Sequence, residues 1–320
     1  MNVDLEALKA FERGLDADRP EESRIPARVL GYGEISTIFE IDSDSCRDLA
    51  CKRMPIFNTQ AEITRYEELY NRYNAALAGI RIEVPRYGFA WFVSDGGRTI
   101  AYDIQEKLPP ESIGNRAIHI LDTENVRALF KLVLHQLTRV WSFNKAYPDR
   151  ALGIDGQISN WAIIGFDPAG KKLPANCRLL YFDTSTPLMK EGGIEQLDPE
   201  LFLRSAPSFM LWLIRWLFLK DVMTRYYDER LVTIDLIANF YKEQRPEMVP
   251  LLVQDANEFF AGEGKELGIR PLSEKEIKSY YSEDAIIWRV FLALRKFDRW
   301  LHRNVYHKPY VYILPGKIKR

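Results

Sequence analysis

The strongest constraint on the fold is a change in sequence pattern near residue 108. Before it, runs rich in β-branched and aromatic residues alternate with glycine-containing turns, as in RIPARVLGYGEISTIFEID and VPRYGFAWFVSDGGRTIAYDIQEKL, and such runs predict strands. After it, segments such as TENVRALFKLVLHQLTRVWSFN place apolar residues at helical spacing, which predicts amphipathic helices. We therefore predict an α+β chain with a β-rich part at residues 1–108 and a mainly helical part at residues 109–320.

The β-rich part is expected to contain one prominent helix. The segment TQAEITRYEELYNRYNAALAG puts apolar and tyrosine side chains on one face and ends at Gly79, a residue type that commonly terminates helices. CRDLACKRMPIF, just before it, is predicted to be a third strand. At the start of the helical part, Thr123 is a candidate N-cap.

Composition excludes several classes of protein. Hydrophobic residues make up 47% of the chain and charged residues 28%, which is typical of a globular protein. The formal net charge is −1, so no basic surplus favours a nucleic-acid partner. The three cysteines are odd in number and form no CxxC pair, so neither a disulfide framework nor a zinc site is expected.

The most apolar run, FMLWLIRWLFLKDVM, is interrupted by Arg215, Lys220 and Asp221. It is shorter than the roughly 20 residues of a membrane span, so we predict a buried helix and no membrane partner. The N-terminus carries charged residues where a signal peptide would be apolar, and a cytoplasmic protein is expected. The tryptophans at helical spacings are expected in the core: Trp212, Trp216, Trp288 and Trp300.

Two polar features in the β-rich part could carry chemistry. Gly31 and Gly33 lie between two predicted strands, where glycines let backbone N–H groups approach a phosphate; a simple turn is the alternative. Lys52 ends an apolar strand pattern about twenty residues later. It is either a solvated strand end or a lysine that neutralises phosphate oxygens with a carboxylate to orient it.

Two more features lie in the helical part. In ALGIDGQISNWAIIGF, Asp155 and Asn160 flank a short turn before an apolar run. The pair is either a polar turn before a buried strand, or a general base followed by an amide oxygen suited to magnesium. RLLYFDTSTP delivers Asp183 at the end of an apolar strand, as a turn residue or as a second magnesium ligand.

In chain order, these features resemble the protein-kinase-like superfamily in its broad sense, which includes aminoglycoside phosphotransferases and choline kinases. Its signatures are a Gly-rich loop, a V-A-I-K lysine, a D-x-x-x-x-N catalytic loop and a D-F-G aspartate. The corresponding segments here are GYGEIS from Gly31, LACK ending at Lys52, Asp155 to Asn160, and FDT around Asp183. The resemblance implies a two-lobed fold with a small β-rich N-terminal lobe and a larger helical C-terminal lobe.

The resemblance also implies that ATP binds between the lobes. Gly31 and Gly33 would cover its phosphates, and Lys52 would contact the α- and β-phosphates. A glutamate of the following helix would orient Lys52: Glu67 is preferred, with Glu62 and Glu68 left open. DIQEKL, which contains Glu106, falls where the interlobe hinge would meet the adenine.

In the catalytic loop, Asp155 would orient or deprotonate the acceptor hydroxyl, and Asn160 and Asp183 would hold Mg²⁺. The function implied is an ATP- and magnesium-dependent phosphotransferase acting on a small-molecule hydroxyl. No motif in the helical part identifies that molecule.

Several departures from the family pattern favour a divergent small-molecule kinase over a protein kinase. Gly153 and Ile154 replace the histidine and arginine before the catalytic aspartate, and Ser36 replaces the third loop glycine. The D-F-G trio reads Asp-Thr-Ser from Asp183. The alternatives are a pseudokinase that keeps nucleotide binding or only the fold as a scaffold, and an enzyme that transfers the nucleotide.

Overall fold

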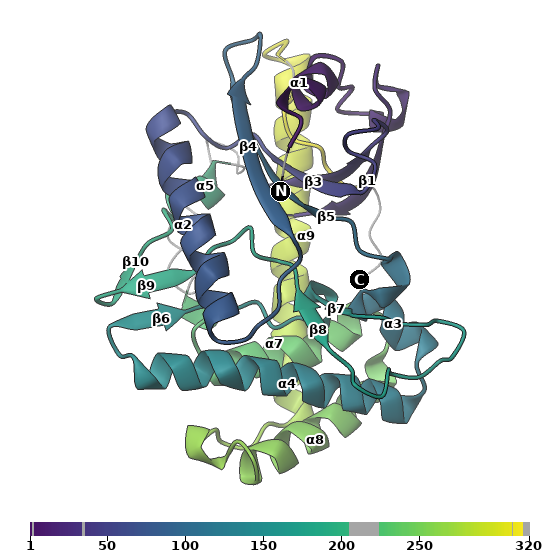
Figure 1. Cartoon of the computed structure of the whole chain (residues 1–320), viewed down its shortest axis with the longest axis vertical. Coiled ribbons are helices and arrows are strands. Elements are labelled where there is room, and N and C mark those ends of the chain that lie inside the picture. The colour runs from purple at the N-terminus through teal and green to yellow at the C-terminus, as the bar shows by residue number, and fades with distance from the viewer. Residues whose placement is uncertain (2, 34–35, 205–223, 309, 316–320) are drawn as a thin grey trace.

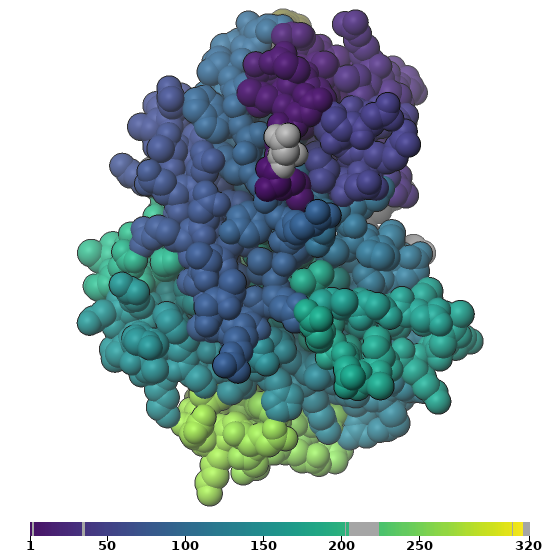
Figure 2. Space-filling view, viewed as in Figure 1, coloured from purple at the N-terminus to yellow at the C-terminus, as the bar shows by residue number. Residues whose placement is uncertain are grey.

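The chain forms a mixed α+β structure, which confirms the predicted class. In this computed structural model, all residues are described except 2, 34–35, 205–223, 309 and 316–320. A small antiparallel sheet with two flanking helices lies at one end of the molecule, and a larger helical region lies at the other (Figure 1). In the space-filling view, the N-terminal third of the chain covers the upper part of the molecule, and α8 (Val249–Ala261) forms its base (Figure 2).

The sheet has five antiparallel strands in the order β1-β2-β3-β5-β4. They are β1 (Ala27–Tyr32), β2 (Thr37–Ile41), β3 (Leu49–Met54), β4 (Tyr87–Val93) and β5 (Thr99–Glu106). The predicted third strand is therefore confirmed, and it lies at the centre of the sheet. The predicted change of pattern near residue 108 falls between β5 and the short 3₁₀ helix η2 (Pro110–Ser112).

One face of the sheet packs against α1 (Leu5–Arg13). Leu8 and Phe11 of α1 are fully buried with Phe39 of β2, and the rings of Phe11 and Phe39 meet edge to face at 5.4 Å. Burial of these side chains removes apolar area from water and stabilises the N-terminal segment. The sheet region thus has a core of its own.

The predicted prominent helix is α2 (Gln60–Gly79), which connects β3 to β4. Thr59 caps its N-terminus by accepting a hydrogen bond from the Glu62 amide, which satisfies one of the free N–H groups of the first turn. The face that carries Ile63, Tyr66 and Tyr73 is buried. These tyrosines point their hydroxyl groups at segments of the candidate site described below.

The helical region is built on α4 (Thr123–Ala146), whose N-cap is Asp122 and not Thr123. Asp122 accepts from the Asn125 amide at 2.8 Å, and the extended backbone of Asp122 makes it the cap residue. The other helices are α3 (Gly114–Ile120), α5 (Glu200–Leu203), α7 (Glu229–Lys242), α8 and α9 (Glu274–Asn304), with 3₁₀ turns η1 (Pro20–Glu22), η3 (Ile158–Asn160), η5 (Pro246–Met248) and η6 (Lys265–Leu267).

Short strands interrupt the helices where the polar motifs lie. The two apolar runs that were predicted to be strands, β7 (Trp161–Ile163) and β8 (Leu179–Tyr181), pair as an antiparallel hairpin with a long connection. β6 (Arg150–Leu152), β9 (Met189–Glu191) and β10 (Ile194–Glu195) form a second small sheet in the order β10-β9-β6. Asp155 and Asn160 therefore lie between strands of two different small sheets.

The expectation for the tryptophans is wrong at Trp300, which is 53% exposed. Helix α9 turns Ile277, Arg295 and Asp298 towards the protein, and Trp300 lies on the other side of the helix with the exposed Phe297. Helical spacing therefore identified an apolar face without showing whether anything covers it. Trp212, Trp216 and the predicted buried helix at 209–223 lie outside the described residues. No helix in the described part of the chain is long and apolar enough to cross a membrane.

Candidate functional site

Lys52 and Asp183, which are 131 residues apart in the chain, meet in the structure. The Lys52 ammonium donates to Asp183 Oδ1 at 3.2 Å and also to the hydroxyl of Ser185. Both side chains are partly accessible, at 18% and 27% exposure. The pair can therefore still be reached by a ligand.

Strand β5 ties the Asp183 segment to the sheet that carries Lys52. The side-chain amide of Gln105 donates to the carbonyl of Phe182 at 2.9 Å and to the hydroxyl of Thr184 at 3.2 Å. Gln105 thus bonds to the residues on both sides of Asp183. These bonds attach the backbone on both sides of Asp183 to β5, the strand next to the one that carries Lys52.

The loop from Asp155 to Asn160 lies beside the Asp183 segment. The Phe182 amide donates to the Asn160 carbonyl at 3.1 Å, at the end of the β7–β8 hairpin. Within the loop, Asp155 Oδ1 accepts from the Gln157 amide at 3.1 Å, and the Asn160 side chain donates to the Asp155 carbonyl at 3.3 Å. This donation leaves the amide oxygen of Asn160 as the atom available to a cation.

The environment of Asp155 raises its pKa to about 7. Burial is the largest cause, followed by the negative charges of Asp235 and Asp183; the Gln157 amide acts in the opposite direction. A base with a pKa near the working pH combines a usable ionised fraction with a strong tendency to accept a proton. Asp155 therefore has the proton affinity of a general base.

Helix α7 supports this loop through residues that the sequence patterns did not single out. The side-chain amide of Gln157 donates to Asp235 at 2.9 Å, and its oxygen accepts from Asn239 at 3.3 Å and Lys242 at 3.1 Å. Asp235 and Asn239 are buried polar residues among apolar residues of α7. Polar residues within this apolar stretch were the sequence signal that could have identified them. The network fixes the position of the residue two places after Asp155.

The structure explains why Gly153 replaces histidine. A Cβ atom at this position would lie 2.8 Å from Leu188 Cβ and 3.1 Å from the ring of Tyr227, closer than side chains normally pack. The Gly153 backbone is held instead by Tyr73, whose hydroxyl donates to its carbonyl at 2.7 Å, and by the Leu188 carbonyl, which accepts from its amide at 2.9 Å. Tyr227 thus helps to fill the space that a side chain at position 153 would need, and Tyr73 holds the backbone there.

The expected helix glutamate does not pair with Lys52. Glu62 binds Arg204 at 2.6 Å, and this contact lowers its pKa to about 2. Glu67 is half-buried with its pKa raised by burial and by Glu68, and Glu68 is exposed. Among the described residues, no ion pair or hydrogen bond joins Lys52 to any of the three. A nucleotide-binding role for Glu67 stays a prediction.

The second carboxylate near Lys52 is Asp103, its direct partner in the β3–β5 register. Asp103 is buried, at 3% exposure, and burial raises its pKa to about 7, although the charge of Lys52 opposes the shift. From α2, the hydroxyl of Tyr66 lies 2.9 Å from Asp103 Oδ2 and 2.7 Å from the Ser185 carbonyl. The Tyr66 hydroxyl can donate its one proton to only one of these two oxygens. If it donates to the Ser185 carbonyl, a protonated Asp103 can donate to the Tyr66 oxygen.

Asp103 leads to a prediction about stability. Its folded-state pKa lies above that of an unfolded aspartate, so between about pH 4 and 7 the folded chain keeps a proton that the unfolded chain has released. The free energy of unfolding therefore falls as pH rises through this window. Asp103→Asn cannot titrate and can donate to Tyr66, and we expect it to stabilise the protein by on the order of 2 kcal/mol more at about pH 8 than at about pH 5.

Thermal unfolding of both proteins across this pH range measures the difference. Asp44→Asn, at an exposed carboxylate on the surface, is the control. An Asp103→Asn variant that loses stability equally at every pH would show that Asp103 is ionised throughout.

The predicted glycine loop approaches Lys52. A Cβ atom on Gly33 would lie 3.8 Å from Lys52 Cε and 2.5 Å from the hydroxyl oxygen of Ser36. Gly31 lies in β1 at an irregularity in its pairing with β2. The Ser36 hydroxyl is buried and has no hydrogen-bond partner within the described part of the chain. Gly33 thus lies close to Lys52; residues 34–35 lie outside the described part of the chain.

Glu106 has partners at the edge of the sheet. Its carboxylate accepts from Arg86 at 2.7 Å, and its backbone amide donates to the Arg86 carbonyl at 3.0 Å. The next amide, that of Lys107, donates to the Asp48 carbonyl at 2.8 Å. Contact between this segment and an adenine stays a prediction.

The donor set fits a magnesium ion that is shared with phosphate groups. No group of three or more His, Cys, Asp or Glu residues is placed to hold a metal ion in the part of the chain that the structure describes. Asp183 and Asn160 supply one carboxylate and one amide oxygen. Mg²⁺ is typically bound in this way in proteins that act on nucleotides, by one or two protein oxygens together with phosphates and water.

The fold and site define an α+β protein in which a sheet lysine contacts an aspartate, and a polar loop is hydrogen-bonded to the segment that carries this aspartate. The chain belongs to a family of unknown function, DUF6206, which matches residues 12–299. No curated protein matches it. Among solved structures, it is similar to WaaP in complex with acyl carrier protein, with 13% sequence identity and a TM-score of 0.32 over 81% of this chain and 89% of that chain.

Proposed function

We propose that this protein is a two-lobed, kinase-like phosphotransferase that uses ATP and Mg²⁺ to phosphorylate a hydroxyl group of a small molecule. The observation that carries the proposal is the contact between Lys52 and Asp183, with Asp155 and Asn160 in the adjoining loop. Lys52 lies on the third strand of an antiparallel sheet, which is where kinases place the lysine that binds phosphates.

Each side chain has a role that matches its surroundings. Lys52 and the backbone of segment 31–36 bind the phosphates of ATP, which supplies the transferred phosphoryl group. Asp183 and the amide oxygen of Asn160 hold Mg²⁺. Asp155 accepts the proton of the acceptor hydroxyl, and Asp235, acting through Gln157 and through its own charge, keeps the loop in place and the proton affinity of Asp155 high.

The contact between Lys52 and Asp183 opens when ATP and Mg²⁺ bind. In the absence of ligand each charge neutralises the other at 3.2 Å. With both ligands bound, Lys52 would hold the phosphates and Asp183 would hold Mg²⁺, whose positive charge would neutralise the carboxylate. The two residues are therefore matched to a ligand that brings both charges at once.

A small-molecule acceptor is supported by the segment after Asp183. Thr184 and Ser185 are buried and bind Gln105 and Lys52, so they hold the site together and do not resemble the start of a mobile activation loop. The three cysteines are free thiols, which suits a protein of the reducing cytoplasm.

A titration with ATP and Mg²⁺ tests the proposal. The folded protein is expected to bind the nucleotide, and Lys52→Met and Asp183→Asn to bind it about 10- to 100-fold more weakly, because each loses a charge-assisted contact. Lys9→Met, at a surface lysine that pairs with Glu6, is the control. No binding by the folded wild type would refute the proposal.

The products separate the remaining candidates. Mass spectrometry after incubation with ATP and a panel of hydroxylated metabolites should show addition of a phosphoryl group. Addition of a nucleotide would indicate nucleotidyl transfer. Tight ATP binding with no product from any acceptor would favour the scaffold.

A further inference from the structure

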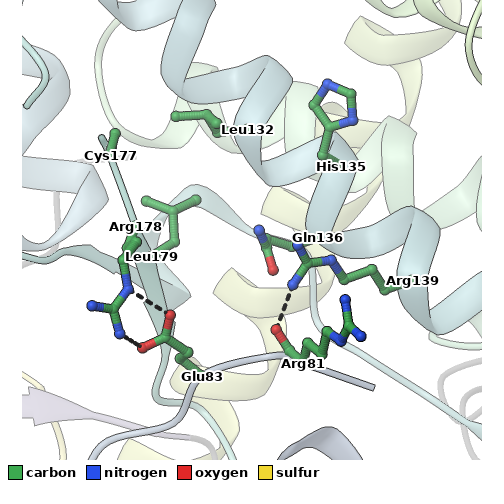
Figure 3. Close-up of a pocket in the computed structure, with 9 residues that line it drawn as sticks. All are labelled: Arg81, Glu83, Leu132, His135, Gln136, Arg139, Cys177, Arg178 and Leu179. Atoms are coloured by element: carbon green, nitrogen blue, oxygen red, sulfur yellow. Dashed lines mark hydrogen bonds and ion pairs between the residues drawn. The ribbon is translucent and has the colours of Figure 1, made fainter. Parts of the chain in front are cut away.

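A pocket of about 400 Å³ lies outside the candidate active site, and Figure 3 shows the side chains that line it. Its walls come from the α2–β4 connection, from α4 and from the start of β8. The lining includes Arg81, Glu83, Leu132, Arg139, Arg178 and Leu179. Arg178 precedes Asp183 by five residues, a separation of about 17 Å along an extended chain. None of the residues proposed for phosphotransfer lines this pocket.

The pocket has a surplus of positive charge. Its three arginines face one carboxylate, Glu83, which is bound by Arg178 through two contacts, one of them 2.8 Å long. Arg139 donates to the neutral backbone carbonyl of Arg81 at 2.5 Å, and its charge acts on Glu83 together with that of Arg178, both lowering the pKa of Glu83. Within the described residues, no hydrogen bond or ion pair engages the Arg81 guanidinium. The surplus of two charges equals the charge of a phosphate dianion.

Arg81 also has an unusual backbone. Its φ of 63° is left-handed, and it follows the end of α2 in the position where glycine is usual. The Ile82 amide donates to the Leu77 carbonyl at 2.9 Å, and the Arg81 amide to the Ala78 carbonyl at 2.9 Å; this pair of bonds is the Schellman motif. A residue with a side chain is less stable in this conformation than glycine.

That cost is a reason to look for a role for the arginine side chain. In Figure 3, the guanidinium groups of Arg81 and Arg139 lie on the same side of the pocket, with the bond from Arg139 to the Arg81 backbone holding them together. Two neighbouring guanidinium groups match the geometry of phosphate oxygens. Leu132 and Leu179 supply an apolar wall beside them.

We propose that this pocket binds a small phosphate-bearing molecule, with Arg81 and Arg139 holding the phosphate group. The bond between Arg178 and Glu83 limits the charge of the site. Removing Glu83 would free a third guanidinium for the ligand. The site needs no residue of the phosphotransferase machinery.

The test uses inorganic phosphate as the probe, with chloride at matched ionic strength and acetate as a singly charged comparison. Phosphate is expected to raise the unfolding temperature more than either. Arg81→Gly should unfold at the same or a higher temperature than the wild type without phosphate, because glycine suits the Schellman position, and should bind phosphate at least about tenfold more weakly. Opposite effects on stability and on binding cannot come from misfolding.

Further variants complete the test. Arg139→Gln should weaken phosphate binding to a similar extent, and Glu83→Gln should strengthen it. Arg65→Ala, at an exposed arginine of helix α2, should change nothing. Wild-type affinity for phosphate in Arg81→Gly and Arg139→Gln, or an equal response to chloride, would overturn the proposal.

Discussion

Replacement of Asp155 by asparagine is expected to reduce phosphotransfer by at least about 100-fold, the usual contribution of a positioned base, and to leave ATP affinity within about twofold of the wild type. The asparagine oxygen can still accept from the Gln157 amide, as Asp155 does at 3.1 Å, so the loop keeps its shape. Only the capacity to accept a proton is lost. Single-turnover rates with saturating ATP and Mg²⁺, together with nucleotide titration, measure the two effects separately.

Asp167→Asn is a matched control. Asp167 also accepts from the amide two residues further on, at 3.0 Å from Ala169, but it lies on the exposed loop between β7 and β8. It should have wild-type activity. Full activity in Asp155→Asn would mean that another group, or no protein group, accepts the proton.

The role of Asp155 as general base also sets the pH dependence of the reaction. Since the pKa of Asp155 is raised to about 7 and its ionised form is the active one, kcat/KM should fall about tenfold per pH unit below this value and level off above it. Asp235→Asn removes the strongest of the neighbouring negative charges but keeps an oxygen for Gln157. It should move the midpoint to lower pH, whereas a purely structural Asp235 would leave the midpoint where it is.

Introducing at Gly153 the histidine that protein kinases carry before the catalytic aspartate is expected to damage the protein. Even a Cβ atom would lie 2.8 Å from Leu188 Cβ and 3.1 Å from the Tyr227 ring, and an imidazole adds five more heavy atoms to a filled space. We expect Gly153→His to lose about 3 kcal/mol or more of unfolding free energy, a fall of about 6 °C or more in unfolding temperature, with no gain in activity.

Gly79→His tests whether the loss of stability is caused by the crowded position 153 and not by a glycine-to-histidine substitution as such. Gly79 has no atom within 4 Å of an added Cβ, so this variant should unfold close to the wild-type temperature. A Gly153→His variant with wild-type stability or higher activity would contradict the packing argument. It would also reopen the view that the missing histidine marks an inactive scaffold.

Lys52 shows which parts of the site could be predicted from the sequence and which could not. Position along the chain singled out Lys52 and Asp183, because each lies in or directly after a short apolar strand pattern, and the structure brings the two side chains into contact. Position along the chain was not enough to select the partner of Lys52. A helix glutamate was expected, but Glu62 pairs with Arg204, and the residue opposite Lys52 is Asp103 of β5.

Asp103 could have been noticed as the one charged residue within the apolar run from Ile100 to Ile104. Its raised pKa could not have been predicted from the sequence, because the pKa of a buried carboxyl depends on which groups surround it in space. Tyr66, Lys52 and Asp183 come from three other segments of the chain. The same holds for Asp235, whose effect on Asp155 requires that α7 pack against the loop from Asp155 to Asn160.

The sequence by itself determined what depends on local order: the α+β class, the position of α2 and of the β7–β8 hairpin, and the polar residues that follow buried strands. Such features arise from periodicity and from turn residues within a few positions of one another. Only the tertiary structure decided what depends on distant segments meeting. The β3–β5 register put Asp103 opposite Lys52, the packing of Leu188 and Tyr227 left room only for glycine at 153, and the end of α2 brought Arg81 to Arg139 beside β8.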